Sequence, residues 1–418
     1  MIFRYHTLCP GCSAKIILRL SIGIDSYQPF YYVCERCGAA NKGSLEIDYS
    51  ILPYGTKITL DGQNHPMETD FENPDQIITI GLDLPCILTG ADSPESQFPF
   101  LHQSTLMGST DKLIQFQNRI SSFRSIVNSD WPKLKRLLTY YTNRDWIQFD
   151  REWENIFEDT SPLPKNDFER HDRLHRALEM LFISLLPELD YLILKKELNY
   201  LISGLPEDKL LKLKKFSIDL TKDKELLYFQ RSLFERLAFM VENFSAISSG
   251  FPALFYNANG KKDLKNLRIM RDDFEILKAH YLSSYEICHK VIKIIIGIQN
   301  IHFRGDPDLF DGGKPTSLTK FDRIPNALKI NYINQNIYPE FHSRWTISLN
   351  KKLRNAIGHN SIYHDLKSGM LIFDDGDPIP YSKFVSDVLN LLPLLLYCIQ
   401  VIKMMYILQY FKNQAKSS

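Results

Sequence analysis

The sequence lacks a clean apolar run long enough to cross a membrane, and it lacks a recognisable secretory signal. The longest apolar stretch, 388–411, is interrupted by Pro393, Gln400 and Lys403 before about 20 uninterrupted residues accumulate. The N-terminus has no basic region followed by an apolar core. We therefore expect a cytoplasmic protein with no membrane partner, in which 388–411 forms a buried core helix. A membrane span is the alternative interpretation.

The sequence also lacks an excess of either charge. It has 50 Lys and Arg residues against 49 Asp and Glu residues, which gives a net charge of +1. The charge of the whole chain therefore gives no argument for or against a polyanionic partner, and any nucleic-acid site must be local. With 44% hydrophobic and 24% charged residues over 418 positions, the chain has a globular composition and a length that predicts two or three domains.

Cysteines with metal-ligand spacing are present near the N-terminus. Four of the seven cysteines form two C-x-x-C pairs, Cys9 with Cys12 and Cys34 with Cys37. Two intervening residues let both thiolates of a pair reach one ion, and two pairs complete a closed tetrahedral shell. A disulfide framework has denser and more even spacing. We expect structural Zn²⁺ as the cofactor, and four reduced cysteines without a metal are the alternative.

The role of this zinc ribbon is left open by its surroundings. Basic residues near it permit contact with nucleic acid, although such charges are usually only a solvated face. Binding of nucleic acid or protein and a purely structural role are both retained. These basic residues are Lys15, Arg19, Arg36 and Lys42.

The apolar pattern predicts a mainly α protein with a small β zinc-ribbon domain at its N-terminus. Apolar residues at helical spacing begin near residue 110 and continue, between breaks rich in Pro and Gly, to the C-terminus. A β-hairpin is expected at 361–374. The expected divisions are a zinc ribbon at 1–48, a small β appendage at 49–90, a linker at 91–109, a helical middle region at 110–260 and a helical domain at 262–413.

An Arg–His pair lies at the end of a helix expected at 339–358. In that helix Asn355 and His359 share a face, and Arg354 lies over the missing side chain of Gly358. The buried stripe of this helix is expected to consist of Trp345, Leu349, Leu353 and Ile357.

Arginine and histidine at this spacing have the chemistry of phosphodiester cleavage. Arginine stays charged and binds phosphate, whereas histidine titrates near neutral pH and acts as base or acid. Cleavage of RNA without a metal needs a base, an acid and a cation at the phosphorus. One arginine and one histidine do not supply both proton transfers, but two copies in a symmetric dimer do.

The run Arg354-Asn355-Ala356-Ile357-Gly358-His359 resembles the Arg-polar-x(3–5)-His signature of HEPN-superfamily ribonucleases. The resemblance covers 262–413 and implies a HEPN-like helical bundle that pairs as a homodimer. It also implies metal-independent endoribonuclease activity on an RNA substrate, of the kind used in antiviral defence, abortive-infection and toxin–antitoxin systems. Catalysis would then fall to Arg354 and His359, with Asn355 orienting them. An antitoxin or a trigger molecule would be a further partner.

The same resemblance implies a polar or acidic residue on an earlier helix, for which Glu286 and His289 are the candidates. A non-catalytic adaptor is the alternative function. Its ribbon would bind nucleic acid or protein, and its HEPN-like domain would serve dimerisation.

Two further patterns are interpreted as ordinary helix surface. His171 and His175 lie four residues apart, which is a metal-binding spacing, but no third ligand is evident and an exposed helix face is expected. The lysine-rich run at 207–224 is likewise interpreted as a solvated face.

Overall fold

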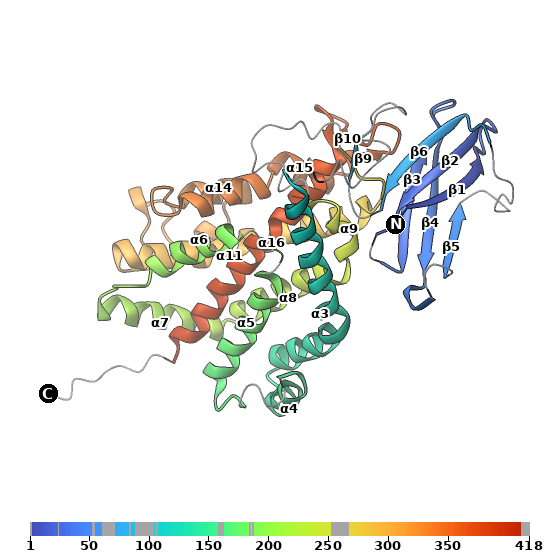
Figure 1. Ribbon diagram of the computed structural model, residues 1–418. Helices are drawn as coiled ribbons and strands as arrows, with labels where there is room; N and C mark the ends of the chain where they lie inside the picture. The colour runs from blue at the N-terminus through green and yellow to red at the C-terminus, as the bar shows by residue number, and fades with distance from the viewer. Residues whose placement is uncertain are drawn as a thin grey trace. The chain divides into compact units, whose positions relative to one another are not determined.

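The chain is mainly helical, with short strands near the N-terminus and again close to residue 370 (Figure 1). The computed structural model describes residues 2–23, 25–51, 55–60, 72–82, 85–87, 104, 108–157, 163–183, 185, 188–251 and 267–410. The expected linker at 91–109 lies almost entirely outside these residues. The chain divides into two units, each built from separate segments. The first unit contains Met1–Asn118, Asn243–Ala279 and Asn355–Leu389, and the second contains Arg119–Glu242, His280–Arg354 and Asn390–Ser418.

Two three-stranded sheets form the N-terminal part of the first unit. Their strand orders are β1-β2-β6 and β3-β4-β5, and the pairing of β2 with β6 is parallel. Alternate residues of β2, namely Ile16, Leu18 and Leu20, are fully buried, as a strand with one face on a core requires. The strands are β1 (Ile2–Leu8), β2 (Lys15–Ser21), β3 (Tyr27–Val33), β4 (Ala40–Ile47), β5 (Thr56–Leu60) and β6 (Gln76–Gly81).

The strands expected in a separate β appendage complete these two sheets. β5 pairs with β4, and β6 pairs with β2. Side chains from both sheets form one apolar cluster, which includes Leu60 from β5 and Ile78 from β6. The ribbon cysteines are therefore supported by strands that follow them in the sequence.

A β-hairpin from the C-terminal part of the chain belongs to the same unit. Its strands are β9 (Ile362–Asp365) and β10 (Met370–Phe373), and Gly369 at the turn has a φ of +67°, as the expected hairpin requires. The regular structure that lies wholly in this unit is completed by the elements η1 (Tyr49–Ile51, a 3₁₀ helix), β7 (Cys86–Ile87), α9 (Phe244–Ser248), β8 (Leu267–Arg268) and β11 (Ile379–Pro380).

The second unit is a set of packed helices. Four helices contribute residues to both units, namely α3 (Thr110–Asn143), α11 (Phe274–Arg304), α15 (Lys351–Gly358) and α16 (Tyr381–Leu408). The first turn of α3 is capped by the Ser109 hydroxyl, which accepts from Lys112 N. The other long helices are α4 (Trp146–Phe157), α5 (Asp167–Ile183), α6 (Glu188–Tyr200), α7 (Glu207–Lys222) and α8 (Glu225–Glu242).

α16 agrees with the buried core helix that its apolar sequence predicts. It is the one helix among the described residues that is long and apolar enough to cross a membrane, and 83% of its most apolar window is buried. Burial of that extent is what the core helix of a soluble protein shows.

The helix expected at 339–358 is two helices, so that prediction was wrong. α14 (Pro339–Ser348) ends where Leu349 adopts φ −107° and ψ 68°, and α15 (Lys351–Gly358) begins two residues later. The side-chain oxygen of Asn350 accepts from the backbone N–H groups of Lys352 and Leu353, at 2.9 and 3.1 Å, and so caps the new helix. The apolar periodicity concealed this break, because the expected stripe of Trp345, Leu349, Leu353 and Ile357 is buried throughout.

The segment 317–335 contains short helical pieces and no long helix. It consists of α12 (Leu318–Asp322), α13 (Asn326–Lys329) and the 3₁₀ helix η5 (Ile330–Tyr332). Pro325 stands directly before α13, where its fixed φ and missing N–H end one helix and start the next.

His171 and His175 are buried, each only 1% exposed, so their interpretation as an exposed helix face was wrong. His171 stacks on Tyr406, with ring centroids 4.6 Å apart. Burial, reinforced by nearby positive charge, lowers the pKa of His171 to about 2 and that of His175 to about 3. Burial also lowers the pKa of His280 to about 3. These histidines are neutral core residues of the second unit.

Acidification from about pH 7 to about pH 5 is expected to destabilise the protein through these histidines. The unfolded chain binds protons near the ordinary histidine pKa of about 6.5, whereas the folded protein does not. The buried histidines therefore cost no stability above about pH 6.5. Below that pH the free energy of unfolding falls by about 1.4 kcal/mol per pH unit for each histidine. Urea unfolding across this pH range measures the loss.

His280→Phe provides the matched comparison. The ring of His280 stacks on Phe239 at a centroid distance of 4.3 Å and an angle of 9°, so phenylalanine preserves the contact and removes one titrating group. The variant should lose less stability than the parent on acidification. Equal pH dependence in the two proteins would contradict this account.

Candidate functional site

The four cysteines of the two C-x-x-C pairs converge on one point in the first unit. Their sulfur atoms all lie within 4.8 Å of one another. The Sγ atoms of Cys9 and Cys37 are 3.6 Å apart, as are those of Cys12 and Cys34. Four sulfurs at about 2.3 Å from a central zinc ion would be separated by about 3.8 Å. The residues therefore fit a tetrahedral metal site, as the sequence predicts.

Each cysteine pair occupies a tight turn between two strands. The first turn joins β1 to β2 and the second joins β3 to β4. The residue after each turn has a positive φ, +59° at Ser13 and +72° at Gly38, and its N–H donates back to the first cysteine of its pair at 2.8 and 2.7 Å. This curl of the backbone directs both thiols of each pair toward the same side.

Gln76 on β6 supports the site and was missed by the sequence analysis. Its Nε2 donates to the sulfur of Cys34 at 3.4 Å, and its Oε1 accepts from Glu35 N at 2.9 Å. Burial favours a raised pKa for the Cys34 thiol, but the backbone N–H groups of Cys37 and Arg36, together with Gln76, outweigh it and lower the pKa to about 6. A thiol that ionises easily is a better metal ligand. Nothing in the spacing of the cysteines points to a residue 39 positions beyond the last one.

Arg354 projects from α15 onto the carboxylate of Glu286 on α11, within the second unit. Its Nε and Nη2 atoms lie 3.0 and 2.7 Å from Oε1 of Glu286. Asn326, at the start of α13, donates from Nδ2 to the other carboxylate oxygen at 2.9 Å. The side chains of Arg354 and Glu286 are 34% and 33% exposed. The carboxylate thus has a separate donor on each oxygen, and the pair lies at the surface of the unit.

Glu286 and His289 were the two candidates on α11 for a polar residue beside the motif. Glu286 contacts Arg354, whereas His289 is buried. His289 is 2% exposed, and its Nδ1 donates to the backbone oxygen of Tyr285 at 2.9 Å. Burial lowers the pKa of His289 to about 4. His289 is therefore a neutral core residue, and Glu286 is the acidic residue beside the motif. The contribution of Asn326 was not predicted, because it lies on a short helix outside the motif.

His359 follows directly after α15 and is exposed. Its backbone N–H donates to Asn355 O at 2.9 Å, so the helical hydrogen-bond pattern reaches it. The chain turns away at Asn360, which has a φ of +52°, and Ser361 N donates back to Ala356 O at 2.9 Å. Gly358 is the last helical residue, and Asn360 adopts the left-handed conformation that ends the helix.

The lysine-rich run at 207–224 falls on α7 and the turn after it. Lys212, Lys215, Lys222 and Lys224 are exposed, in agreement with the solvated face that was expected.

No protein-family model, curated protein or solved structure matches the chain.

The cysteine cluster is expected to bind about one zinc ion per chain. Cys12→Ser or Cys34→Ser should remove most of the metal, because three thiolates leave the tetrahedral shell open and a hydroxyl is a poor zinc ligand. Elemental analysis of the purified proteins measures the metal content. Cys398→Ala, which changes a buried cysteine outside the cluster, should keep the zinc. Full zinc content in the Cys12 and Cys34 variants would exclude this site.

Proposed function

We propose that this protein is a metal-independent endoribonuclease of HEPN type, whose site combines Arg354 and His359 from two copies of the chain. The observation that carries the proposal is that the side chain of Arg354 is partly exposed and held in one orientation. Its side chain is about one-third exposed at the surface of a helical unit and is oriented by Glu286. Most solvated arginines have no such fixed orientation, because holding a long side chain in one geometry costs entropy.

The role proposed for Arg354 is to neutralise the phosphate during cleavage. A guanidinium keeps its charge at any physiological pH and presents a planar set of donors to phosphate oxygens. Glu286, itself held by Asn326 at 2.9 Å, fixes the plane of that group before the substrate arrives. Orientation before binding lowers the cost of forming the transition state.

The role proposed for His359 is proton transfer. It is exposed at the end of α15, where solvent and substrate reach the ring. In a dimer, His359 of one copy takes the proton from the 2′-hydroxyl, which attacks the phosphorus. His359 of the other copy gives a proton to the departing 5′-oxygen, so that a cyclic phosphate and a free 5′-hydroxyl result. Asn355, one helical turn before His359, is proposed to orient this chemistry.

Zinc has a structural role in this proposal. Four cysteines leave no coordination position for water or substrate, so a zinc ion held there would stabilise the ribbon and would not activate a nucleophile. Of the basic residues near the ribbon, Lys42 is paired with Asp272 at 2.8 Å, whereas Arg36 is exposed and is the proposed contact for RNA or for a trigger protein.

A non-catalytic adaptor is the second candidate, and one observation favours it. The charge of Arg354 is already balanced by Glu286 at 2.7 Å, as it would be in an arginine with a purely structural role. In that case the helical domain would serve dimerisation, and the ribbon would bind the partner. Cleavage measurements separate the two candidates.

Arg354→Ala and His359→Ala are each expected to lower the rate of RNA cleavage by at least about a hundredfold, which is the usual contribution of an acid–base or charge-stabilising residue. The assay contains a chelator, so that contaminating metal-dependent nucleases are inactive. Matched controls are Arg323→Ala and His342→Ala, which change the same residue types elsewhere in the helical part of the chain. Equal cleavage by parent and motif variants, or no cleavage by the parent under any activating condition, would remove the ribonuclease proposal and leave the adaptor.

The specific activity is expected to rise with protein concentration until the dimer is fully formed. A monomer supplies one histidine for two proton transfers, so the dissociated protein should be nearly inactive. Light scattering across the same concentrations gives the fraction of dimer. Activity that is proportional to protein concentration through the monomer–dimer transition would show that one copy suffices.

A further inference from the structure

An exposed tyrosine and an exposed lysine meet between α8 and α11 in the second unit. Lys290 Nζ donates to the hydroxyl of Tyr228 at 2.9 Å and lies 5.0 Å from the centre of the Tyr228 ring. The side chain of Tyr228 is 49% exposed, and Lys290 is also exposed. A large aromatic side chain is thus held at the surface by a cation.

Lys290 lies one helical turn beyond Glu286 on α11. Residues four apart share a face of a helix, with side chains about 6 Å from each other. Lys290 therefore follows the carboxylate that holds Arg354, on the same face of the same helix.

Lys290 differs from the other cations on this face in what it contacts. Lys293 is paired with the carboxylate of Glu225 at 2.8 Å, and Arg354 is paired with Glu286. The contact of Lys290 is with a neutral phenol. Among the described residues no carboxylate forms an ion pair with Lys290, so an incoming phosphate would not have to displace one.

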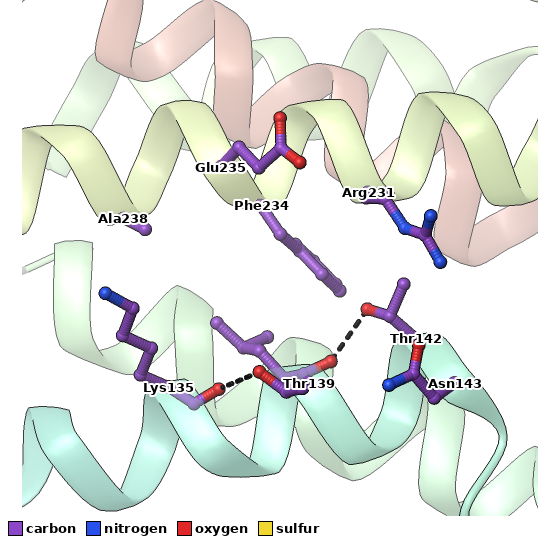
Figure 2. Close-up of a pocket in the computed structure, with 9 residues that line it drawn as sticks. Lys135, Thr139, Thr142, Asn143, Arg231, Phe234, Glu235 and Ala238 are labelled. Carbon is purple, nitrogen blue, oxygen red and sulfur yellow. Dashed lines mark hydrogen bonds between the residues drawn. The ribbon is translucent and has the colours of Figure 1, made fainter.

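Arg231 extends this surface along α8 to a pocket. Tyr228 and Arg231 are three residues apart on α8, so they share a face, and Arg231 is exposed. The pocket has a volume of about 230 Å³ and lies between α3 and α8. Figure 2 shows Arg231 reaching from α8 toward Thr142 and Asn143 at the end of α3, with Lys135 at the opposite end of the pocket.

We propose that Tyr228, Lys290 and Arg231 form a track for single-stranded RNA that leads away from Arg354. A base stacks on the Tyr228 ring, and the flanking phosphates contact Lys290 and Arg231. Binding of this kind tolerates many sequences, because every base presents a flat face to the aromatic ring. The inference rests on the proposed function for its choice of RNA, but it concerns binding and not the cleavage step.

The test measures the affinity of a single-stranded RNA of about ten nucleotides with 2′-O-methyl riboses, which cannot undergo attack by the 2′-oxygen. Tyr228→Ala should weaken binding about tenfold through loss of stacking. Tyr228→Phe keeps the ring and should bind within about twofold of the parent. Lys290→Gln and Arg231→Gln should each weaken binding and reduce the slope of log affinity against log salt by about 0.7, the value for one lost phosphate contact on a single strand.

Matched controls come from the same unit. Tyr200 is 60% exposed on α6 and Lys215 is exposed on α7, so Tyr200→Ala and Lys215→Gln remove a similar ring and a similar charge elsewhere. Both should bind like the parent with an unchanged salt slope.

The track would be overturned by a parent that does not bind RNA, by parental affinity and salt slope in the Tyr228→Ala and Lys290→Gln variants, or by equally weak binding of the Tyr228→Phe and Tyr228→Ala variants. Double-stranded RNA bound as tightly as the single strand, with the same dependence on Tyr228, would also exclude a stacked base. Cleavage of unmodified RNA is scored separately. An Arg354→Ala protein that still cleaves would refute the proposed catalytic site and leave the binding result intact.

Discussion

The hydroxyl of Tyr281 joins two helices where the apolar pattern predicts one. It donates to Ser348 O at 3.0 Å and accepts from Asn350 N at 2.8 Å, and the Tyr281 side chain is fully buried. Ser348 O would otherwise be an unpaired acceptor in the interior at the end of α14, which is costly. Because α15 begins only after this break, its direction is set independently of α14, and Arg354 projects onto Glu286 from a separate eight-residue helix. The Tyr281 hydroxyl and the Asn350 side chain together stabilise the break after which α15 presents Arg354 to Glu286.

What the sequence predicted well is what local spacing determines. Two residues between cysteines fix where a pair of thiols can meet, so Cys9, Cys12, Cys34 and Cys37 were identified from the sequence alone and cluster within 4.8 Å. The hairpin at 361–374 and the buried helix α16 follow equally from short-range pattern. The choice between Glu286 and His289 needed the fold, because both lie on α11 and differ in which face is buried.

The features that the sequence did not reveal all depend on partners distant along the chain. Gln76 reaches Cys34 because β6 pairs with β2 in parallel, and nothing near the cysteines encodes that pairing. His171 and His175 have the spacing of a surface metal pair, but α5 buries that face against aromatic rings. The break at Leu349 was concealed for a related reason: Leu349 is buried, and a buried apolar residue has the same place in the sequence pattern whether it lies in a helix or in the link between two helices. Periodicity reports which residues are buried, and it does not report what covers them.

The strength of the ion pair between Arg354 and Glu286 bears on both proposed functions, because it sets how easily a phosphate could displace the carboxylate. Each side chain is about one-third exposed, at 34% and 33%, so solvent screens the attraction and the pair contributes at most about 1 kcal/mol to stability. A deeply buried pair would hold its arginine against any competitor, because separating it strands a charge in a medium of low dielectric constant. At this surface a phosphate oxygen can replace the carboxylate at little cost, since guanidinium binds both in the same planar geometry. The ion pair is therefore weak enough for a phosphate to replace the carboxylate. Until then, Glu286, whose other oxygen accepts from Asn326, keeps the guanidinium in a fixed orientation.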